Sequence, residues 1–370
     1  MHIGFFVAKF LFSPTLFKGK KTVMNKKLFS GKNCIPLFIY FLICFPFGYY
    51  SYKFGSPDVA GQHDFYSYYP LYKNFDISAV ESPFNMRLVS SFFIFALNKT
   101  GLFYDVKISY AHSGIGQKTY FSAVFFNYLS AVLTCFVVFL TVRKFHQNQF
   151  FSFTVGSLYL FQYGTIFWGM GGLADGFSAF LFALIFYFYI SRSYWILPLL
   201  AVSVLQREII FLSLAPIAFV EYFFNEKKKY FVATVSLSVL FFAIYLILRK
   251  TVFFTPRWSA MLSTGSIMDM AFYPTVGFFS YVRQSILTQN ILALYFFVIL
   301  YKVYKKITIN KANLLVVVAL FAEINLISFA FLAIDNAGRY FYISSAAMLF
   351  FLAYELKPLL IPETKDFQQL

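Results

Sequence analysis

Long apolar runs recur along most of the chain, and they constrain its fold more than any other feature of the sequence. A helix needs about 20 mainly apolar residues to cross the hydrocarbon core of a bilayer. Runs that approach this length lie at residues 34–52, 121–142, 150–168, 174–190, 230–248, 286–304, 312–333 and 340–356. Each run is therefore predicted to form a membrane-spanning helix.

The apolar stretch between residues 194 and 224 is interrupted by Gln206, Arg207 and Glu208. Burying these side chains at the middle of a bilayer would cost several kcal/mol. We therefore predict two short spans that meet at a polar tip. Together the runs predict an all-α, polytopic transmembrane bundle of about ten spans, with both termini on the same side.

Composition supports this fold class. Hydrophobic residues make up 60% of the chain, charged residues only 12%, and the mean hydropathy is +0.68. A soluble domain of this composition would lack the polar residues to cover its core. The three cysteines all fall inside apolar runs and show no spacing typical of a disulfide framework or a zinc site.

The net charge of +16 is distributed as in a membrane protein. Its basic residues flank apolar runs and do not form a stripe with stacking aromatics, which argues against a nucleic-acid partner. With the N-terminus in the cytoplasm, most lysines and arginines fall on the inner side and most acids on the outer side. The many phenylalanines and lysines are typical of A/T-rich codons, so we expect a bacterial plasma membrane protein with its chemistry facing outward.

The sequence predicts one transmembrane domain, residues 34–370, after a basic cytoplasmic tail, residues 1–33. Met24 precedes an Asn-Lys-Lys run that resembles a natural start, so residues 1–23 are either a mis-called extension or an interfacial segment. The first span lacks a small-x-small cleavage site and is predicted to be an uncleaved anchor.

Two long outer loops are predicted, at residues 53–120 and 249–285. Loops of this length are usually functional or disordered, and their many aromatic residues argue against disorder. Residues 86–97 are too short to span comfortably and carry polar residues on one side. We expect them to form a helix that lies in the outer interface.

Asp64 is the leading candidate for catalysis, because it follows the first span at the depth of the lipid headgroups. A carboxylate there could take a proton from a hydroxyl group. The alternative is a solvated loop acid or a turn acceptor. His63, Asp58, Asp76 and Glu81 share this loop, but they lack a recognisable metal-ligand spacing. We therefore predict no metal and no other cofactor.

Arg207, Glu208 and Arg339 are the leading candidates for substrate binding. Arginine presents a planar fork of donors that suits a phosphate better than the point charge of lysine does. The alternatives are a structural Arg207–Glu208 ion pair that caps two helices and, for Arg339, an interfacial anchor. Arg87 and Arg257 are further candidates, and we expect them to contact lipid headgroups.

Asp175 and Glu323 are the remaining acids of interest. Asp175 lies in a glycine-rich segment, residues 169–176, that lacks the Lys-Ser/Thr pair of a phosphate loop. This segment predicts a tight reversal between helices, with Asp175 lining a cavity. Glu323 lies within an apolar run, so we expect it to be neutral or hydrogen-bonded to a neighbouring helix, with a proton relay as the alternative.

These features resemble the C-type superfamily of integral-membrane glycosyltransferases, which use polyprenyl-phosphate sugars. The resemblance rests on Asp64 in the first outer loop, the arginine-led segment at residues 86–89, the polar tip at residues 206–208, and Arg339 at the outer end of a late span. Members often have two adjacent acids in the first loop, where this chain has His63 and Asp64. The chain is most similar to smaller bacterial members of the cell-envelope kind.

The resemblance implies a glycosyltransferase that moves a sugar from a polyprenyl-phosphate carrier to a glycan, lipid or protein acceptor, with inversion. Asp64 would be the base, and arginines would stabilise the departing phosphate. The residues expected to contact substrate are His63, Arg87, Asp175, Arg207, Glu208, Arg257 and Arg339. A polysaccharide polymerase, a lipid-linked glycan flippase or transporter, and a non-enzymatic scaffold remain alternatives.

Overall fold

The computed structural model describes residues 31–54, 64–103, 117–224, 228–253, 290–330 and 337–360. Within these ranges every regular element is a helix, which confirms the all-α prediction. His63 and Arg257, two of the predicted site residues, lie outside the described residues, as does much of the two long segments predicted to be outer loops.

The helices follow one another closely along the chain. In order they are α2 (Gly31–Phe54), α3 (Asp64–Asn74), the 3-10 turn η1 (Phe84–Met86), α4 (Leu88–Lys99), α5 (Gln117–Val142), α6 (Gln149–Leu158), the 3-10 turn η2 (Tyr159–Phe161), the π turn η3 (Thr165–Gly169), α7 (Asp175–Ile190), α8 (Ile196–Val204), α9 (Ile209–Phe224), α10 (Lys228–Thr251), α14 (Asn290–Tyr304), α15 (Lys311–Ala330), α16 (Ala337–Ile343) and α17 (Ser345–Leu360).

Three of the described helices are long and apolar enough to cross a membrane. They are Cys34–Lys53 in α2, Lys118–Val142 in α5 and Val232–Thr251 in α10. Much of α2 and α10 is exposed on the molecule, whereas α5 is largely buried. Exposed apolar helices of this length have the character of a membrane protein, because lipid is the solvent that their side chains match.

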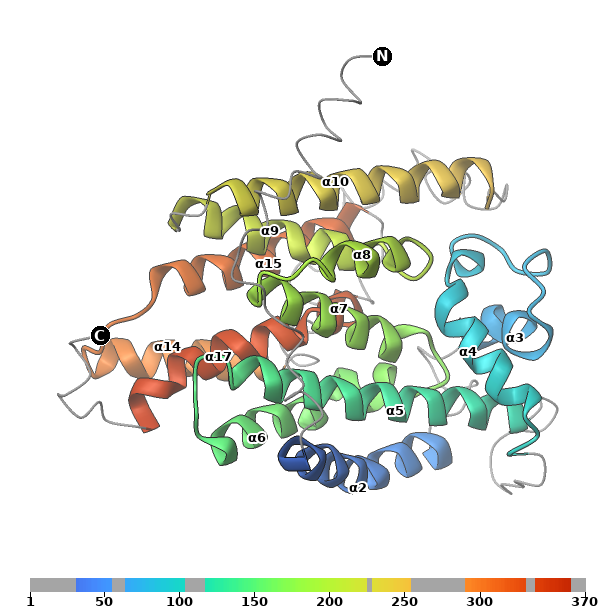
Figure 1. Ribbon diagram of the computed structural model, residues 1–370, viewed down its shortest axis with the longest axis horizontal. Coiled ribbons are helices and arrows are strands. Elements are labelled where there is room, and N and C mark those ends of the chain that lie inside the picture. Colours follow the sequence, from blue (N-terminus) through green and yellow to red (C-terminus); the bar gives the residue numbers. More distant parts are fainter. Residues whose placement is uncertain are drawn as a thin grey trace, which may run out of the picture.

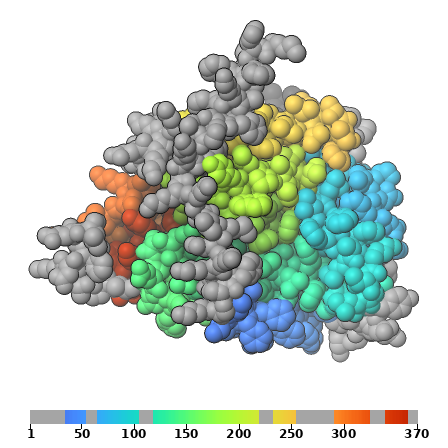
Figure 2. Space-filling view, viewed as in Figure 1, coloured from blue at the N-terminus to red at the C-terminus, as the bar shows by residue number. Residues whose placement is uncertain are grey.

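The long helices run side by side, and α3 and α4 close one end of the bundle (Figure 1). Helix α5 packs against α2, α6 and α7, while α9 packs against α10 and α15. Helix α14 packs against α17, which also contacts α5 and α7. The segment 64–103 forms a distinct block at one end in the space-filling view (Figure 2). We call residues 64–103 the end block; it contributes the first residues of the candidate site.

The polar tip predicted at residues 206–208 is a break between two helices. Helix α8 ends at Val204 and α9 begins at Ile209. The backbone N–H of Val89, at the start of α4, donates to the carbonyl of Leu205 at 3.3 Å. The interruption was therefore predicted correctly, and it meets the end block directly.

Two of the predicted spans are interrupted within their apolar runs. The run 150–168 leaves α-helix after Leu158, because the backbone at Gly164 and Gly169 passes closely over the ring of Tyr342. A Cβ atom on Gly169 would lie 2.0 Å from the Tyr342 hydroxyl. The run 340–356 breaks at Ser344, whose hydroxyl donates to the Phe341 carbonyl at 2.7 Å and competes with the helical hydrogen bonds.

The predicted helix at residues 86–97 begins two residues later than expected, at Leu88, and ends at Lys99. Its polar residues Ser90, Ser91 and Asn98 face the protein and are buried. Phe92 and Phe93 are about half exposed, at 51% and 48%. An outward apolar face and an inward polar face suit a helix that lies against lipid and lines a polar site.

Candidate functional site

Asp64 and Arg339 meet although 275 positions separate them in the chain. Asp64 is the first residue of α3, and Arg339 lies in the first turn of the short helix α16. The Nη1 atom of Arg339 donates to Asp64 Oδ2. The Arg339 side chain is nearly buried, at 6% exposed, whereas that of Asp64 is 32% exposed. The end block is thereby tied to the far end of the chain.

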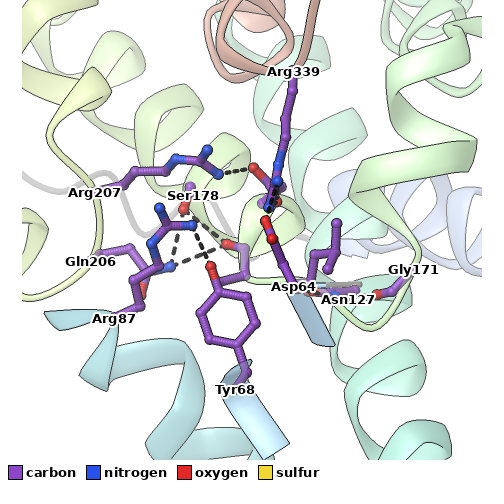
Figure 3. A network of polar contacts seen from close by, with 12 residues as sticks. Asp64, Tyr68, Arg87, Asn127, Gly171, Ser178, Gln206, Arg207 and Arg339 are labelled. Atoms are coloured by element: carbon purple, nitrogen blue, oxygen red, sulfur yellow. Dashed lines mark hydrogen bonds and ion pairs between the residues drawn. The ribbon is translucent and has the colours of Figure 1, made fainter. Parts of the chain in front are cut away.

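Asp175 lies at the centre of the cluster and joins two arginines. Its Oδ2 atom accepts hydrogen bonds from Arg339 Nε at 2.9 Å and Arg339 Nη2 at 2.7 Å. Its Oδ1 atom forms an ion pair with Arg207 Nη1. The Asp175 side chain is completely buried. Figure 3 shows Arg207 and Arg339 entering the same space from two different elements, with Asp64 beside Arg339.

The glycine-rich segment explains how a carboxylate can occupy this position. Asp175 begins α7, where the helix dipole favours an acidic side chain. Asn127 of α5 holds the preceding turn, because its Nδ2 atom donates to the carbonyls of Gly171 and Leu173 at 2.5 and 2.6 Å. A Cβ atom on Gly176 would lie 2.1 Å from the Gly169 carbonyl oxygen. The segment is thus the predicted reversal, and it places Asp175 in the site.

Arg87 reaches the cluster from the end block. It lies between η1 and α4, its Nη1 atom donates to the Tyr68 hydroxyl, and it is only 5% exposed. Its guanidinium packs on the rings of Tyr68 and Phe84, with centroid distances of 5.6 and 5.7 Å. The structure corrects the expectation of an arginine that contacts headgroups, because Arg87 is buried within the protein.

Gln206 connects three elements around the site. Its Oε1 atom accepts from the backbone N–H of Ser90 in α4 at 3.0 Å. Its Nε2 atom donates to the Ala174 carbonyl at 3.2 Å and to the Ser178 hydroxyl at 3.0 Å. Gln206 therefore fixes the polar tip against both the end block and the start of α7.

One interpretation of the sequence was an ion pair between Arg207 and Glu208. In the structure each of them has another partner. Arg207 pairs with Asp175 and packs over the ring of Tyr340 at 5.4 Å. Glu208 Oε2 accepts a hydrogen bond from the Tyr245 hydroxyl of α10 at 2.9 Å. Arg207 therefore belongs to the central cluster, and Glu208 links the tip to α10.

The charges of the cluster shift the pKa values of its members. Burial raises the pKa of Asp64, but Arg339 outweighs this, assisted by Arg87 and Arg207, and the net shift is downward. Burial also raises the pKa of Glu208, and Arg87 and Arg207 again bring it below its ordinary value. Burial, with Arg87 and Arg339 nearby, lowers the pKa of Arg207 to about 9. The carboxylates of Asp64 and Glu208 are therefore both ionised at neutral pH.

The remaining sequence candidates lie elsewhere or have local roles. Asp76 is exposed, and its Oδ1 atom accepts from the backbone N–H groups of Ser78 and Ala79 at 3.0 and 3.2 Å, a turn role. Glu323 is half-buried in α15, and its Oε2 atom has no hydrogen-bond partner within the described ranges. In the same part of the chain, no group of three or more His, Cys, Asp or Glu is placed to hold a metal ion.

Sequence reasoning did not single out Tyr68, Asn127 or Ser178 for this site. Asn127 and Ser178 were visible in principle, because a polar side chain within an apolar run usually faces the protein interior. Tyr68 carried no such signal, since the chain has 28 tyrosines.

The site is an alternating chain of carboxylates and guanidinium groups: Asp64, Arg339, Asp175 and Arg207. Asp64 is its most exposed member, and its carboxylate can accept a proton. The arginines can bind an anion with several oxygen atoms. Comparison of the chain with family models, with curated proteins and with solved structures found no match.

Proposed function

We propose that this protein is a membrane glycosyltransferase that moves a sugar from a polyprenyl-phosphate carrier to an envelope glycan, lipid or protein acceptor. The observation that carries the proposal is the contact of Arg339 with both Asp64 and Asp175. It brings a partly exposed carboxylate and a buried, fixed guanidinium to one point. The resemblance to the C-type superfamily assigns a base and a phosphate-binding group to the same two residues.

The reaction needs only the groups that this cluster supplies. Asp64 accepts the proton of an acceptor hydroxyl, whose oxygen forms a bond to the anomeric carbon of the sugar. The bond between that carbon and the phosphate oxygen breaks, and its electron pair leaves with the phosphate. Attack from the opposite face inverts the configuration. Arg339 and Arg207 stabilise the negative charge that develops on the leaving phosphate.

The proposed setting is a bundle of about ten spans in a bacterial plasma membrane, with the site on the outer side. The distribution of lysines and arginines supports this orientation. The exposed apolar faces of α2 and α10 support contact with lipid. A carrier lipid that lies against such a face would bring its phosphate to the site at a fixed depth, which lowers the entropic part of the barrier.

The proposal is tested by sugar transfer in purified protein. Wild-type protein in lipid nanodiscs is supplied with polyprenyl-phosphate monosaccharides and with extracted envelope acceptors, and products are identified by mass spectrometry. We expect transfer by the wild type and none by Asp64→Asn. Asp76→Asn is the matched control, because it removes an exposed acid of the end block that is engaged only in a local turn.

Two outcomes would contradict the proposal. Full activity of Asp64→Asn would remove Asp64 from the mechanism. Transfer only from lipid-linked oligosaccharides, and never from monosaccharide donors, would identify a polysaccharide polymerase instead. Comparison of envelope glycans from cells with and without the protein would then name the product.

A further inference from the structure

Arg339 has two carboxylate partners, and they differ in how firmly they are held. Asp175 receives two hydrogen bonds from Arg339, pairs also with Arg207, and is completely buried. Asp64 receives one contact, from Nη1, and about a third of its side chain is exposed. Asp175 is therefore the fixed partner of Arg339, and Asp64 is the partner that a ligand can reach.

Asp64 is proposed to act as a base and Arg339 to bind a phosphate. While the two side chains are paired, each obstructs the role of the other. A carboxylate held by a guanidinium is a weak base, because the positive charge stabilises its ionised form. All three nitrogens of the Arg339 guanidinium contact a carboxylate of Asp64 or Asp175. In this arrangement Asp64 is a poor proton acceptor, and the Nη1 donor that contacts Asp64 is not available to a phosphate.

We propose that the phosphate of the carrier lipid takes the place of Asp64 on Arg339 and thereby releases Asp64 to act as the base. The exchange rests on the proposed function and adds an order of steps to it. The donor binds first, and the acceptor hydroxyl can be deprotonated only afterwards. Asp175 stays on Arg339 throughout and keeps the guanidinium oriented.

The charges of the site support a one-for-one exchange. The donor is a phosphodiester with one negative charge, the same charge as the carboxylate of Asp64. Replacing one by the other leaves no buried guanidinium unpaired, which would be costly. Arg207 offers a further donor, because its Nε atom is buried and has no hydrogen-bond partner among the described residues. The arriving phosphate therefore gains contacts that Asp64 does not make.

The exchange is tested with methyl farnesyl phosphate, a phosphodiester without a sugar, titrated by calorimetry into wild-type protein, Asp64→Asn and Asp76→Asn. Removing the competing carboxylate should tighten binding about tenfold in Asp64→Asn, since hydrogen bonds between charged groups are typically of this strength. Asp76→Asn loses the same charge at an exposed turn and should bind like the wild type. Farnesol, which lacks the phosphate, should bind all three proteins equally if they share one fold.

Equal or weaker binding of the phosphodiester by Asp64→Asn would overturn the exchange, and so would an equal gain in Asp76→Asn. Infrared difference spectra of the wild type with isotope-labelled aspartate give a test that needs no variant. Phosphodiester binding should shift a carboxylate band, and an unchanged band would overturn the exchange.

The sugar-transfer assay separates this inference from the proposed function. Tighter phosphodiester binding by Asp64→Asn, without sugar transfer by the wild type, would support the exchange and reject the transferase. Transfer by the wild type that Asp64→Asn abolishes, without tighter binding, would support the transferase and reject the exchange.

Discussion

Asp175 and Arg339 are joined by two hydrogen bonds to one oxygen, from Nε at 2.9 Å and from Nη2 at 2.7 Å, across 164 positions of the chain. The contact fixes the plane of the guanidinium, because two of its nitrogens are held by the same atom. It joins the start of α7 to α16. The geometry of the whole site therefore depends on a carboxylate that no substrate needs to touch.

Replacing Asp175 by Asn should destabilise the protein. The change leaves the buried Arg207 with a neutral partner and leaves Arg339 with Asp64 as its remaining charged partner. Removing one member of a buried ion pair typically costs about 3–5 kcal/mol. The free energy of unfolding is measured by titration with SDS in mixed micelles. Asp76→Asn is the control and should lose far less. An equal free energy of unfolding in Asp175→Asn and the wild type would show that the pair is not a structural anchor.

Replacing Arg339 by Lys should reduce sugar transfer while the charge is kept. Lysine carries a compact ammonium and cannot contact Asp64 and Asp175 through a planar fork. Loss of one preoriented donor to a developing oxyanion costs about 100- to 1000-fold in rate, and we expect kcat to fall within this range. Arg143→Lys, directly after the last residue of α5, is the control. Equal losses in both variants would indicate a general defect and not a role in the site.

The convergence of Asp64, Arg207 and Arg339 was predictable because each follows or precedes an apolar run at the end that the sequence assigns to one side of the membrane. Charged residues at the same membrane depth are confined to a thin layer, which brings them near one another. Their pairing was not predictable. Asp175 joins both arginines only because α7 packs against α5 and the turn before it is held by Asn127, and these contacts are set by tertiary packing.

Arg87 shows the opposite limit of sequence reasoning. A lone arginine before an apolar segment has the same pattern whether it faces lipid headgroups or the protein. Its burial follows from Tyr68 and Phe84, which cover it from the same end block. The helix breaks at residues 159–169 and at Ser344 were hidden for a similar reason, since Gly, Ser and Tyr scarcely lower the hydropathy of an apolar run.

Replacing Gln206 by Leu should loosen the polar tip. Leucine has a similar volume but makes none of the three hydrogen bonds with Ser90, Ala174 and Ser178. Leaving buried backbone groups without partners costs about 1–3 kcal/mol. Unfolding free energy and sugar transfer should both fall, because Arg207 follows directly in the chain. Gln147→Leu, an exposed site, is the control, and a loss of similar size there would contradict this role.

Replacing Gly176 by Ala should displace the start of α7. The added Cβ would lie 2.1 Å from the Gly169 carbonyl oxygen and 2.9 Å from Asn127 Oδ1. The first of these is a backbone atom, so the turn itself must shift, and Asp175 must shift with it. Overpacking of this kind typically costs about 1–3 kcal/mol. At Gly48 the three atoms nearest to an added Cβ all belong to the Tyr128 side chain, the closest at 3.1 Å. Gly48→Ala should therefore cost less, and a cost equal to that of Gly176→Ala would contradict the argument.

The dependence of sugar transfer on pH should differ between kcat/KM and kcat. Protonated Asp64 cannot accept a proton, so activity is present above its pKa and is lost as the pH falls through it. In the free protein burial raises the pKa of Asp64, but Arg339, Arg87 and Arg207 lower it further. Since kcat/KM reports the free enzyme, it should stay constant as the pH is lowered and fall only below about pH 4, the ordinary aspartate pKa.

With the donor bound, the phosphate has taken the place of Asp64 on Arg339, and the pKa of Asp64 should be higher. The fall in kcat, which reports the enzyme–substrate complex, should therefore appear at a higher pH than the fall in kcat/KM. The phosphodiester of the donor stays ionised over this range and does not contribute. Steady-state rates across the pH range give both profiles: rates with donor well below saturation give kcat/KM, and rates with saturating donor give kcat. Profiles that fall at the same pH would mean that Asp64 keeps its contact with Arg339 during the reaction.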